Sequence, residues 1–593
     1  MEDPSYYIHS DYRQNDDIED IYKRRELSRY TNENIHNAVK DLLDGNLNVL
    51  TIQPAINEIR KKYKFSPKYS QLLLELEESV LKHHVNAKIL KRLLVTTKVR
   101  SNSGVLVVTV VTSPYPSVNG KVQKFSCKWN CYYCPQEPGQ PRSYLHDEPA
   151  VLRANVNKFD PVLQFTDRVL GLYDKGLPMD KIELIVLGGT WESYPEEYRT
   201  EFIRDLFYAA NIISPRQIRE RKTLKEEQLI NETANCKIIG LTLETRPDTI
   251  NEASISSFRT YGCTRIQLGV QHVDQSILDK VHRECTTQDV KNAIRLLLNA
   301  CYKVDIHIMP NLPGSCVKKD EEMFNFFLND PNLQADQWKI YPCEIVPWTV
   351  IKKWHESGTY TPYEEHELRK LLIKVKQKIH PWIRINRVIR DIPKQYILGG
   401  VNIPNMRDEI LHEMKQQGKK CRCIRCREVG LKSIDLSKFK RKTRRYFASD
   451  GTEFFISYED ETETLLGFLR LRFTPCATFR SIQNTAMIRE LHVYGKLTPT
   501  FKCNFMDKSV QHSGIGTRLL KSAEFMAKIR GYKYICVIAG VGTREYYRKR
   551  GYVLKTNEEY LVKYIGHEID TFFRILLLCA IYCILSYYPM SIK

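Results

Sequence analysis

The sequence predicts an α/β fold, and three patterns along the chain support this. Seven short apolar runs recur between about residues 100 and 400, and helical stretches separate several of them. A second series of strands and helices occupies about 446–563, whereas about the first 95 residues show helical periodicity alone. Strand–helix alternation at this spacing indicates parallel βα units. The chain is therefore expected to hold a parallel sheet, a second α/β domain and a helical N-terminus.

The seven apolar runs suit an open or partial barrel better than a sandwich. They are Val105–Val111, Ile182–Leu187, Ile239–Leu243, Arg265–Val270, Val304–Met309, Trp338–Tyr341 and Trp382–Ile389. Ligands of such folds bind at the C-terminal ends of the strands, so the residues that follow each run are the candidate site residues.

Composition limits the class of protein. The chain has 593 residues, 90 Lys+Arg, 70 Asp+Glu and a net charge of +20, and its 42% of hydrophobic residues exclude wholesale disorder. The positive surplus suits a polyanion such as nucleic acid, although an uninvolved basic surface explains it equally well. There are 17 cysteines, an odd number, and the acidic N-terminus is no signal peptide. These features predict a reducing compartment in which some cysteines are metal ligands.

Two parts of the chain carry clusters of basic residues. The first 95 residues contain IEDIYKRRELSRY, NIHNAVKDLLDG and YSQLLLELEESVLKHH, with apolar residues at helical spacing and Lys and Arg between them. A polar connector at about 400–430 is followed by the strongly basic residues 432–445. A solvated face is the alternative explanation of any single cluster.

Cys127, Cys131 and Cys134 form a CxxxCxxC motif after the first predicted strand. Three thiolates in one loop can hold three irons of a four-iron cluster and leave the fourth iron without a protein ligand. An open iron can bind S-adenosylmethionine, whose sulfonium is then cleaved by an electron to give a radical. The spacing and the aromatic residue before the last cysteine match the radical-SAM signature. A zinc site is the alternative, but zinc normally takes four ligands.

Other candidate residues end the predicted strands. Gly188, Gly189 and Thr190 follow the strand KIELIVL, where small residues let backbone donors approach a methionyl amino group. Glu244 ends the strand GLTLE and Arg246 follows it. This carboxylate and this guanidinium at the C-terminal end of a strand are expected to bind ribose or substrate, and a structural salt bridge is the alternative for either. The segment His307–Gly314 resembles the late proline–glycine turn of the same superfamily.

A second cysteine group, Cys421, Cys423 and Cys426, offers three thiolates within six residues. This spacing predicts a structural zinc site with a fourth ligand from nearby in the fold, for which His412 and His380 are candidates. Uncoordinated thiols are the alternative.

Near the C-terminus, Gln511, Gly514 and Gly516 match the Q/RxxGxG/A motif that binds acetyl-CoA in GNAT acyltransferases. The motif opens an apparent helix, whose free backbone N–H groups can cradle a pyrophosphate. The strand Arg489–Gly495 precedes it and ICVIAGVGTREYYRKRGY follows it, in the order of that fold. A tyrosine of the later helix lies near the thioester in that family, so Tyr546 and Tyr547 are candidates.

The last segment, Ile575–Met590, has no charged residue, and only three residues follow it. At about 1.5 Å per residue a helix over Thr571–Met590 spans about 30 Å, enough for the hydrocarbon core of a bilayer if Arg574 snorkels. This predicts a C-terminal transmembrane helix that acts as a tail anchor, with a short buried or amphipathic helix as the alternative.

A radical-SAM domain joined to a GNAT domain resembles the catalytic subunit family of Elongator, radical-SAM and acetyl-CoA-dependent enzymes that modify tRNA. The resemblance covers about residues 48–563. Its markers include PRSYLHDEPAVLRA, MDKIELIVLGGT, LTLETRPD, RIQLGVQH, CRCIRCREVG, RELHVYG and GVGTREYYRKRGY. It implies transfer of an acetyl-CoA-derived carboxymethyl group to carbon 5 of the wobble uridine.

The resemblance also implies a domain division and site roles. The expected divisions are a tRNA-binding helical region (1–95), a radical-SAM domain (96–400), a zinc-binding linker (401–431), a GNAT domain (432–566) and the anchor (571–590). Cys127, Cys131 and Cys134 would hold the [4Fe-4S] cluster. Acetyl-CoA would be held by Lys181, the backbone of Glu490, Leu491, His492 and Val493, the turn at Gln511, Gly514, Ile515, Gly516 and Thr517, and Tyr547. Tyr547 and the three cluster cysteines would be the catalytic residues.

The implied partners are tRNA, other Elongator subunits where present, a membrane, and a second copy in a homodimer. The N-terminal helices and Lys432–Arg445 would contact tRNA phosphates. Three features depart from the family: the compact CxxxC spacing, the lack of Gly-Gly after Cys134, and the apolar tail, which resembles that of apicomplexan members. The tail would place the catalytic domains on the cytosolic face of the mitochondrial outer membrane or the endoplasmic reticulum. A protein lysine acetyltransferase and a non-catalytic membrane-tethered scaffold are the competing functions.

Overall fold

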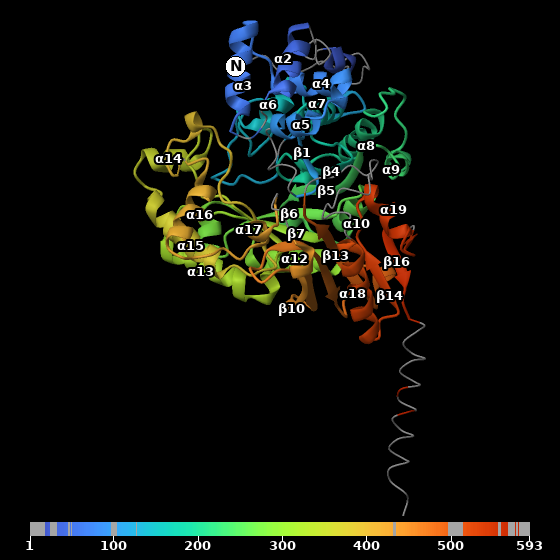
Figure 1. Cartoon of the computed structure of the whole chain (residues 1–593). Helices are drawn as coiled ribbons and strands as arrows, with labels where there is room; N and C mark the ends of the chain where they lie inside the picture. Colours follow the sequence, from blue (N-terminus) through green and yellow to red (C-terminus); the bar gives the residue numbers. More distant parts are fainter. Residues whose placement is uncertain are drawn as a thin grey trace, which may run out of the picture.

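The computed structural model describes residues 18–23, 33–45, 48, 50–95, 103–125, 127–401, 403–430, 435–495, 514–555, 559–566, 576 and 579. Two seven-stranded sheets dominate them, and a group of N-terminal helices lies beside the first sheet (Figure 1). A two-stranded ribbon, β2 (Ser117–Val118) with β3 (Lys121–Val122), completes the strands.

The first sheet is the predicted partial barrel. Its strands are β1 (Leu106–Val111), β4 (Lys181–Leu187), β5 (Lys237–Thr245), β6 (Arg265–Gln271), β7 (Lys303–Ile308), β8 (Gln337–Ile340) and β9 (Arg384–Arg387). They lie side by side in chain order, each neighbouring pair is parallel, and β1 and β9 are free edges. All seven predicted strands are therefore confirmed, in an open sheet that does not close.

Helices connect these strands, because a parallel sheet needs a crossover after each strand, and most of them bury the outer face of the sheet. They are α6 (Pro149–Val156), α7 (Pro161–Tyr173), α8 (Glu196–Ile212), α9 (Leu224–Asn231), α10 (Glu252–Thr260), α11 (Gln275–Lys280), α12 (Thr287–Asn299), α13 (Val317–Asn329), α14 (Val350–Glu356) and α15 (Glu365–Lys378). Several start at a capping box: in α12, Thr286 Oγ1 accepts from the N–H of Asp289 while the Asp289 carboxylate accepts from Thr286 N–H.

The second sheet has the order β10-β11-β12-β13-β14-β16-β15. Its strands are β10 (Lys440–Ala448), β11 (Gly451–Glu459), β12 (Leu465–Phe473), β13 (Thr485–Val493), β14 (Tyr534–Val537), β15 (Val553–Lys555) and β16 (Tyr560–Tyr564). The helices of this part are α18 (Ile515–Ile529) and α19 (Arg544–Arg548), and α16 (Met406–Gln416) and α17 (Ile424–Arg427) connect it to the barrel. β13 and β14 are parallel and paired only from Thr485 to Ile488, so beyond Ile488 the two strands part.

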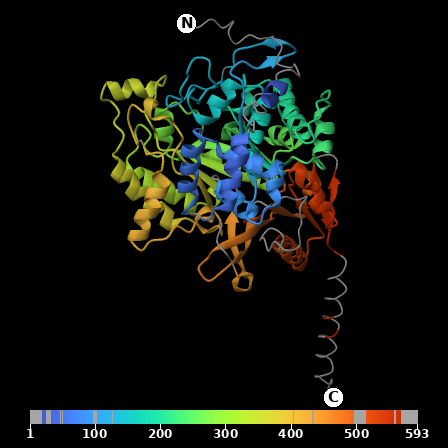
Figure 2. The same cartoon turned by 45° about the horizontal axis from the view of Figure 1, so that its top comes forward.

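The N-terminal helices α2 (Glu33–Asp44), α3 (Ile52–Tyr63), α4 (Tyr69–Glu78) and α5 (Ala87–Leu94) share a core of their own, which includes Val39, Ile56 and Leu90 (Figure 2). Ile18 and Ile21 instead belong to the core of the barrel. The stretch before α2 thus packs on a different part of the molecule from the helices that follow it.

The second sheet lies across the N-terminal ends of the barrel strands. Arg489 of β13 donates to the carbonyl of Tyr302, just before β7, at 2.8 Å, and to the carboxylate of Asp336, just before β8, at 2.7 Å. Arg470 of β12 donates to the carbonyl of Trp382, before β9, at 2.7 Å. The C-terminal ends of the strands therefore stay clear of the second sheet.

Among the described residues, no helix combines the length and the apolar character that crossing a bilayer requires. The predicted span 571–590 lies outside the described residues except for Leu576 and Cys579.

Candidate functional site

A pocket lies at the C-terminal ends of the barrel strands, as the fold class predicts. Its empty volume, open mouth included, is about 550 Å³. Cys127, Cys131 and Cys134 all line it. Strand ends contribute Gly189, Thr190, Glu244, Arg246 and Gln271 to the lining, the cysteine loop contributes Trp129, and the segment after α11 contributes Arg283. The structure thus brings the first cysteine motif together with the Gly-Gly-Thr turn and Glu244, as predicted.

Cys131 faces two cationic side chains, and the sequence did not predict that either of them contacts this cysteine. Its sulfur accepts from Arg246 Nη1 at 3.5 Å and from Arg283 Nη1 at 3.6 Å. Burial alone raises the pKa of this thiol, but the two guanidinium groups outweigh it and hold the pKa below its usual value. Burial dominates at Cys134 and raises the pKa of its thiol to about 11. Arg246 is fixed in turn by Asp248, at 2.9 Å, and by the face of Trp129.

The sulfurs of Cys127, Cys131 and Cys134 are not gathered as closely as the ligands of a single ion. No set of potential ligand atoms within 4.8 Å of one another includes all three among the described residues, whereas the second cysteine group forms such a set. A cluster of four irons holds its thiolates farther apart than one ion does. Three thiols on one pocket wall, with two arginines to offset anionic charge, fit an iron–sulfur cluster.

The turn after β4 must be glycine at its first position. Gly188 has φ +145°, and a Cβ there would lie 1.6 Å from Thr112 Oγ1. Gly189 also has a positive φ, and the buried Thr190 places its hydroxyl 3.7 Å from Cys127 Sγ. The turn therefore presents the Gly189 backbone and the Thr190 hydroxyl to the pocket beside the first cysteine.

Glu244 lines the same pocket from near the end of β5, the strand that pairs with β4. Tyr144 donates its hydroxyl to Glu244 Oε2 at 2.6 Å, and His307 Nδ1 is 3.7 Å from Oε1. Burial raises the pKa of the Glu244 carboxyl, although Lys339 and the Tyr144 hydroxyl oppose the rise. Burial also lowers the pKa of His307 well below its usual value, so this imidazole is neutral.

Charged and amide side chains fill the barrel interior below Glu244, and sequence reasoning missed them. Lys339 Nζ donates to Gln267 Oε1 at 2.6 Å, and Asn386 donates to Asp305 at 3.2 Å. At the N-terminal ends of the strands, Arg265 pairs with Glu183 at 2.5 Å and lies 4.0 Å from Glu490 of β13. Burial lowers the pKa of Lys339 to about 8. These polar residues alternate with apolar ones along their strands, and this alternation is the sequence pattern that could have predicted a polar barrel interior.

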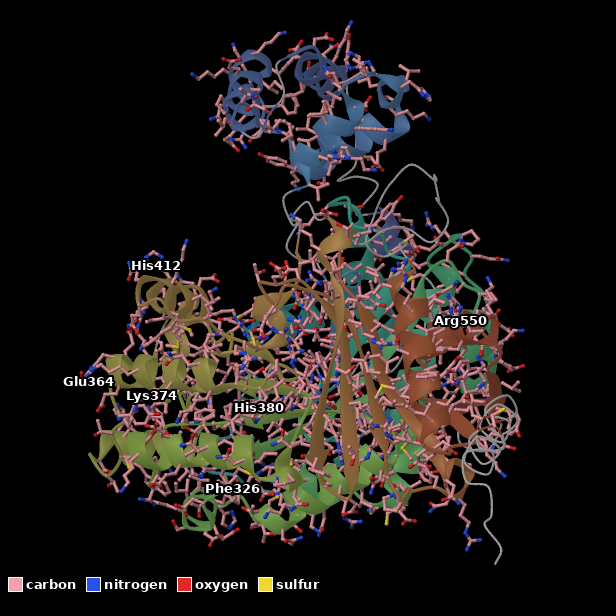
Figure 3. All side chains as sticks on the ribbon, turned by 60° about the horizontal axis from the view of Figure 1, so that its bottom comes forward. Phe326, Glu364, Lys374, His380, His412 and Arg550 are labelled. Atoms are coloured by element: carbon pink, nitrogen blue, oxygen red, sulfur yellow. The ribbon has the colours of Figure 1, made fainter. Side chains whose placement is uncertain are left out.

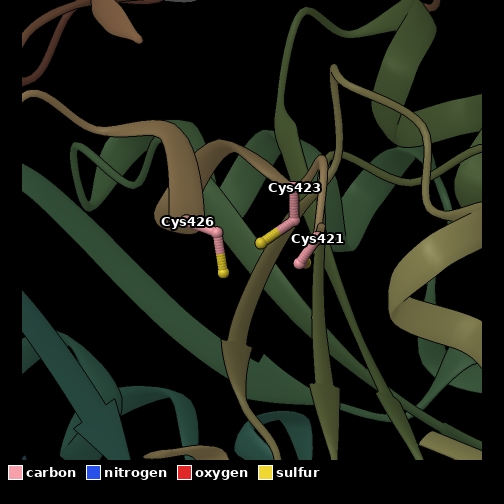
Figure 4. Close-up of side chains that lie close together, drawn as sticks. All are labelled: Cys421, Cys423 and Cys426. Carbon is pink, nitrogen blue, oxygen red and sulfur yellow. The ribbon is translucent and has the colours of Figure 1, made fainter. Parts of the chain in front are cut away.

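The second cysteine group is assembled at the connector. Cys421, Cys423 and Cys426 place their sulfurs within 4.8 Å of one another (Figure 4). Neither His412 nor His380 belongs to this group: His412 Nε2 contacts Gln416, and His380 Nε2 contacts the carbonyl of Leu328 (Figure 3). The histidine candidates for a fourth ligand are thus wrong in this structure. A buried cation lies beside the group: Lys376 Nζ is 3.9 Å from Cys426 Sγ.

The predicted coenzyme elements of the second domain lie around the gap between β13 and β14. Glu490, Leu491, His492 and Val493 follow the point where the strands part, and a bulge at Arg489 interrupts the pairing of β13 with β12 there. Gly514, with φ +78°, precedes α18, whose first turn contains Ile515, Gly516 and Thr517. A Cβ at Gly516 would lie 2.9 Å from the Tyr546 hydroxyl, so that hydroxyl sits against the glycine turn. Tyr547 is 6% exposed and packs in the domain core.

Two predicted coenzyme residues lie elsewhere. Gln511 falls outside the described residues. Lys181 is the first residue of β4, in register with Lys237 of β5, and is therefore at the opposite end of the barrel from the cysteine pocket. Lys237 in turn abuts Gly542 of the second domain, so Lys181 lies near the domain boundary.

Comparisons with known proteins agree with this architecture. The model of the radical SAM superfamily matches residues 125–327, and that of the radical SAM C-terminal domain matches residues 335–416. The chain is 39% identical over 480 residues to the tRNA uridine(34) acetyltransferase of Methanocaldococcus jannaschii, covering 78% of this chain and 86% of that protein. It is 35% identical over 529 residues to Elongator complex protein 3 of Danio rerio, covering 86% of this chain and 93% of that protein.

A solved structure extends the likeness to three dimensions. The archaeal Methanocaldococcus infernus Elp3, with residues 1–46 deleted, superposes with a TM-score of 0.67 at 35% identity and covers 78% of this chain and 99% of that one. Sequence identity at this level over most of both aligned chains shows that they share a family as well as a fold. The chain belongs to the radical-SAM family of tRNA uridine(34) acetyltransferases and Elongator complex protein 3.

Proposed function

We propose that this chain modifies uridine 34 of tRNA, adding to carbon 5 a carboxymethyl group derived from acetyl-CoA, with S-adenosylmethionine as the radical source. The observation that carries the proposal is the pocket that the three motif cysteines line together with Gly189, Thr190 and Glu244. The family membership gives the reaction class, since the named relatives are tRNA uridine(34) acetyltransferases.

In the pocket, Cys127, Cys131 and Cys134 would hold the iron–sulfur cluster. When bound, such a cluster supplies the electron that cleaves the sulfonium of S-adenosylmethionine. Arg246 and Arg283 offset the charge of the thiolate at Cys131, to which both donate. The backbone of Gly188 and Gly189 offers donors and acceptors to the methionyl end of S-adenosylmethionine, and the Glu244 carboxylate, oriented by Tyr144, suits ribose hydroxyls.

In the second domain, the gap between β13 and β14 and the glycine turn before α18 would hold acetyl-CoA. The backbone groups of Glu490–Val493 on the side of the gap are not used by β14, so they can bond a pantetheine arm. The N-terminal turn of α18 can accept the pyrophosphate. Tyr546, whose hydroxyl contacts this turn, joins Tyr547 as a candidate to orient the thioester.

The test is anaerobic reconstitution with iron, sulfide, S-adenosylmethionine, acetyl-CoA and tRNA, followed by mass spectrometry of the nucleosides. Wild type should form 5-carboxymethyluridine and 5′-deoxyadenosine, and Cys131→Ala should form neither. Cys285→Ala is the matched control, because Cys285 is buried near the pocket without lining it. Full activity of Cys131→Ala would refute the radical mechanism. Acetylated protein without modified tRNA would favour a lysine acetyltransferase.

We also propose a structural zinc ion at Cys421, Cys423 and Cys426. Three clustered thiols with a buried lysine beside them suit the charge of a zinc–thiolate centre. Metal analysis of the purified chain should give one zinc per chain, lost in Cys423→Ser.

The sequence of residues 571–590 supports a further proposal, a tail anchor that holds the enzyme on the cytosolic face of an organelle membrane, with tRNA and other Elongator subunits as partners. Deletion of residues 571–593 should move the protein from the membrane fraction to the supernatant. An unchanged membrane fraction would disprove the anchor.

A further inference from the structure

The structure describes all six tryptophans of the chain, and Trp348 is the one whose side chain is exposed. Its side chain is 43% exposed, and its φ of 59° lies in the left-handed region that bulky residues rarely adopt. The other tryptophans near the pocket are engaged: Trp129 faces Arg246, and Trp354 meets the ring of Tyr132 edge-on. An exposed indole on a strained backbone is costly to keep, and such strain is typical of binding sites.

Backbone hydrogen bonds hold Trp348 next to the cysteine loop, whose residues Cys131 and Cys134 line the pocket. The Trp348 carbonyl accepts from the N–H of Gln136, two residues after Cys134, at 3.1 Å. The next residues continue this contact, because the Tyr132 carbonyl accepts from Val350 N–H at 3.0 Å and from Ile351 N–H at 3.2 Å. The position of the indole is thus tied to the loop that carries the cluster ligands.

A second aromatic ring reaches the same place from the loop after β9. The rings of Trp348 and Tyr396 have centroids 6.1 Å apart and are tilted by 49°. Tyr396 is held by its hydroxyl, which donates to Asp147 Oδ2 at 3.2 Å, and Gln395 donates to the same oxygen at 3.0 Å. Tyr396 therefore supports Trp348 from one side and leaves much of the indole uncovered.

We propose that Trp348, backed by Tyr396, is a stacking platform for an unpaired base of the anticodon loop, next to the nucleotide that enters the cysteine pocket. Proteins that read single-stranded RNA stack splayed-out bases on aromatic side chains, because every base has a π-face. A base next to the reacting nucleotide needs a flat, exposed ring close to the cysteine loop, and Trp348 supplies one. The inference rests on the proposed function in taking tRNA as the substrate.

The experiment measures binding of full-length holoenzyme to tRNA and to two short probes, a single-stranded oligonucleotide of anticodon-loop sequence and an RNA duplex. Trp348→Ala should weaken binding of tRNA and of the single strand by about 5- to 150-fold, the usual effect of removing one stacking residue. Trp348→Phe should restore most of it. Duplex binding should not change. Phe525→Ala is the matched control, since Phe525 is an exposed aromatic of α18.

Salt dependence separates stacking from phosphate contact. Loss of a stacked base should leave the slope of log Kd against log salt unchanged, whereas loss of one phosphate contact lowers the slope by about one. Cleavage of S-adenosylmethionine without RNA should be the same in wild type and Trp348→Ala, which shows that the pocket is intact. Unchanged single-strand affinity, equal weakening of duplex binding, or an altered salt slope would each overturn the platform. If wild type binds the single strand through Trp348 yet modifies no tRNA, the platform stands and the proposed function fails.

Discussion

Replacement of Arg489 by methionine should destabilise the docking of the second domain on the barrel. Arg489 is 1% exposed and donates five hydrogen bonds: two to Asp336, two to Glu453 and one to the Tyr302 carbonyl. Asp336 belongs to the barrel and Glu453 to the second sheet, so this one guanidinium joins the two halves. Methionine fills similar space but satisfies neither carboxylate.

The free-energy cost of the substitution depends on the two buried carboxylates, Asp336 and Glu453, that lose Arg489. Removing one partner of a buried ion pair costs about 3–5 kcal/mol, since the remaining charge stays buried without compensation. Asp336 keeps Arg470 at 3.3 Å, and Glu453 keeps Arg472 at 3.1 Å, so the loss should fall at the lower end, about 3 kcal/mol. That free energy corresponds to about a 150-fold change in the opening equilibrium.

Hydrogen exchange detects this change locally. Amides of β13 and of the barrel turn before β8 should lose about 150-fold in protection, while amides of α3 and α4, in the separate N-terminal core, should not change. Arg530→Met is the control, because Arg530 lies over the rings of Phe454 and Phe473, both within the second domain. A loss of protection below about threefold at β13 would refute the view that this buried network joins the domains.

Three other predictions concern the pocket, a buried acid and the second cysteine group. Gly188→Ala should reduce cleavage of S-adenosylmethionine more than tenfold, because the new Cβ meets Thr112 Oγ1 at 1.6 Å; a normal 5′-deoxyadenosine yield would contradict this. Asp160, the N-cap of α7, is buried, and burial raises the pKa of its carboxyl to about 7. The same carboxyl ionises at lower pH in the unfolded chain, so the free energy of unfolding of wild type should fall as the pH rises from about 4 to about 7. Asp160→Asn keeps the cap and removes this titration, so its denaturation midpoint should exceed that of wild type at pH 8 but not at pH 4, and equal midpoints at pH 8 would count against it. Cys423→Ser should abolish zinc binding and lower the thermal midpoint, whereas Cys476→Ser, at an exposed cysteine, should do neither.

The elements that the sequence predicted well depend on local patterns. Each of the seven barrel strands combines a short apolar run with flanking helical periodicity, and parallel strands buried on both faces have that appearance. The run Trp382–Ile389 was too long, since β9 covers only Arg384–Arg387. The spacing of Cys127, Cys131 and Cys134 is also local, so the motif could be interpreted without a fold.

The residues that were missed depend on contacts between distant segments. Arg246 follows β5 and was expected to bind ribose or substrate, whereas Arg283 follows α11 and was not singled out. Only the folded barrel brings both to Cys131. Arg489 was taken only as part of a coenzyme strand, because a charged residue in a strand gives no sign that its partner is Asp336, 153 residues away. The histidine ligands failed for the same reason: proximity in sequence did not place His412 at the second cysteine group.

The two candidate cofactor sites occupy opposite ends of the barrel, and this makes their functions separable. Arg265, the first residue of β6, lies near Glu490 of the coenzyme strand, while Gln271, its last, lines the cysteine pocket. Six residue steps of a strand correspond to about 20 Å. Gly188→Ala should therefore leave acetyl-CoA affinity unchanged, and Arg489→Met should weaken acetyl-CoA binding while uncoupled cleavage of S-adenosylmethionine continues. Calorimetry with acetyl-CoA and quantification of 5′-deoxyadenosine measure the two ends independently. A variant at one end that alters both quantities equally would show that the barrel transmits the change, and the two sites could not then be treated as separate.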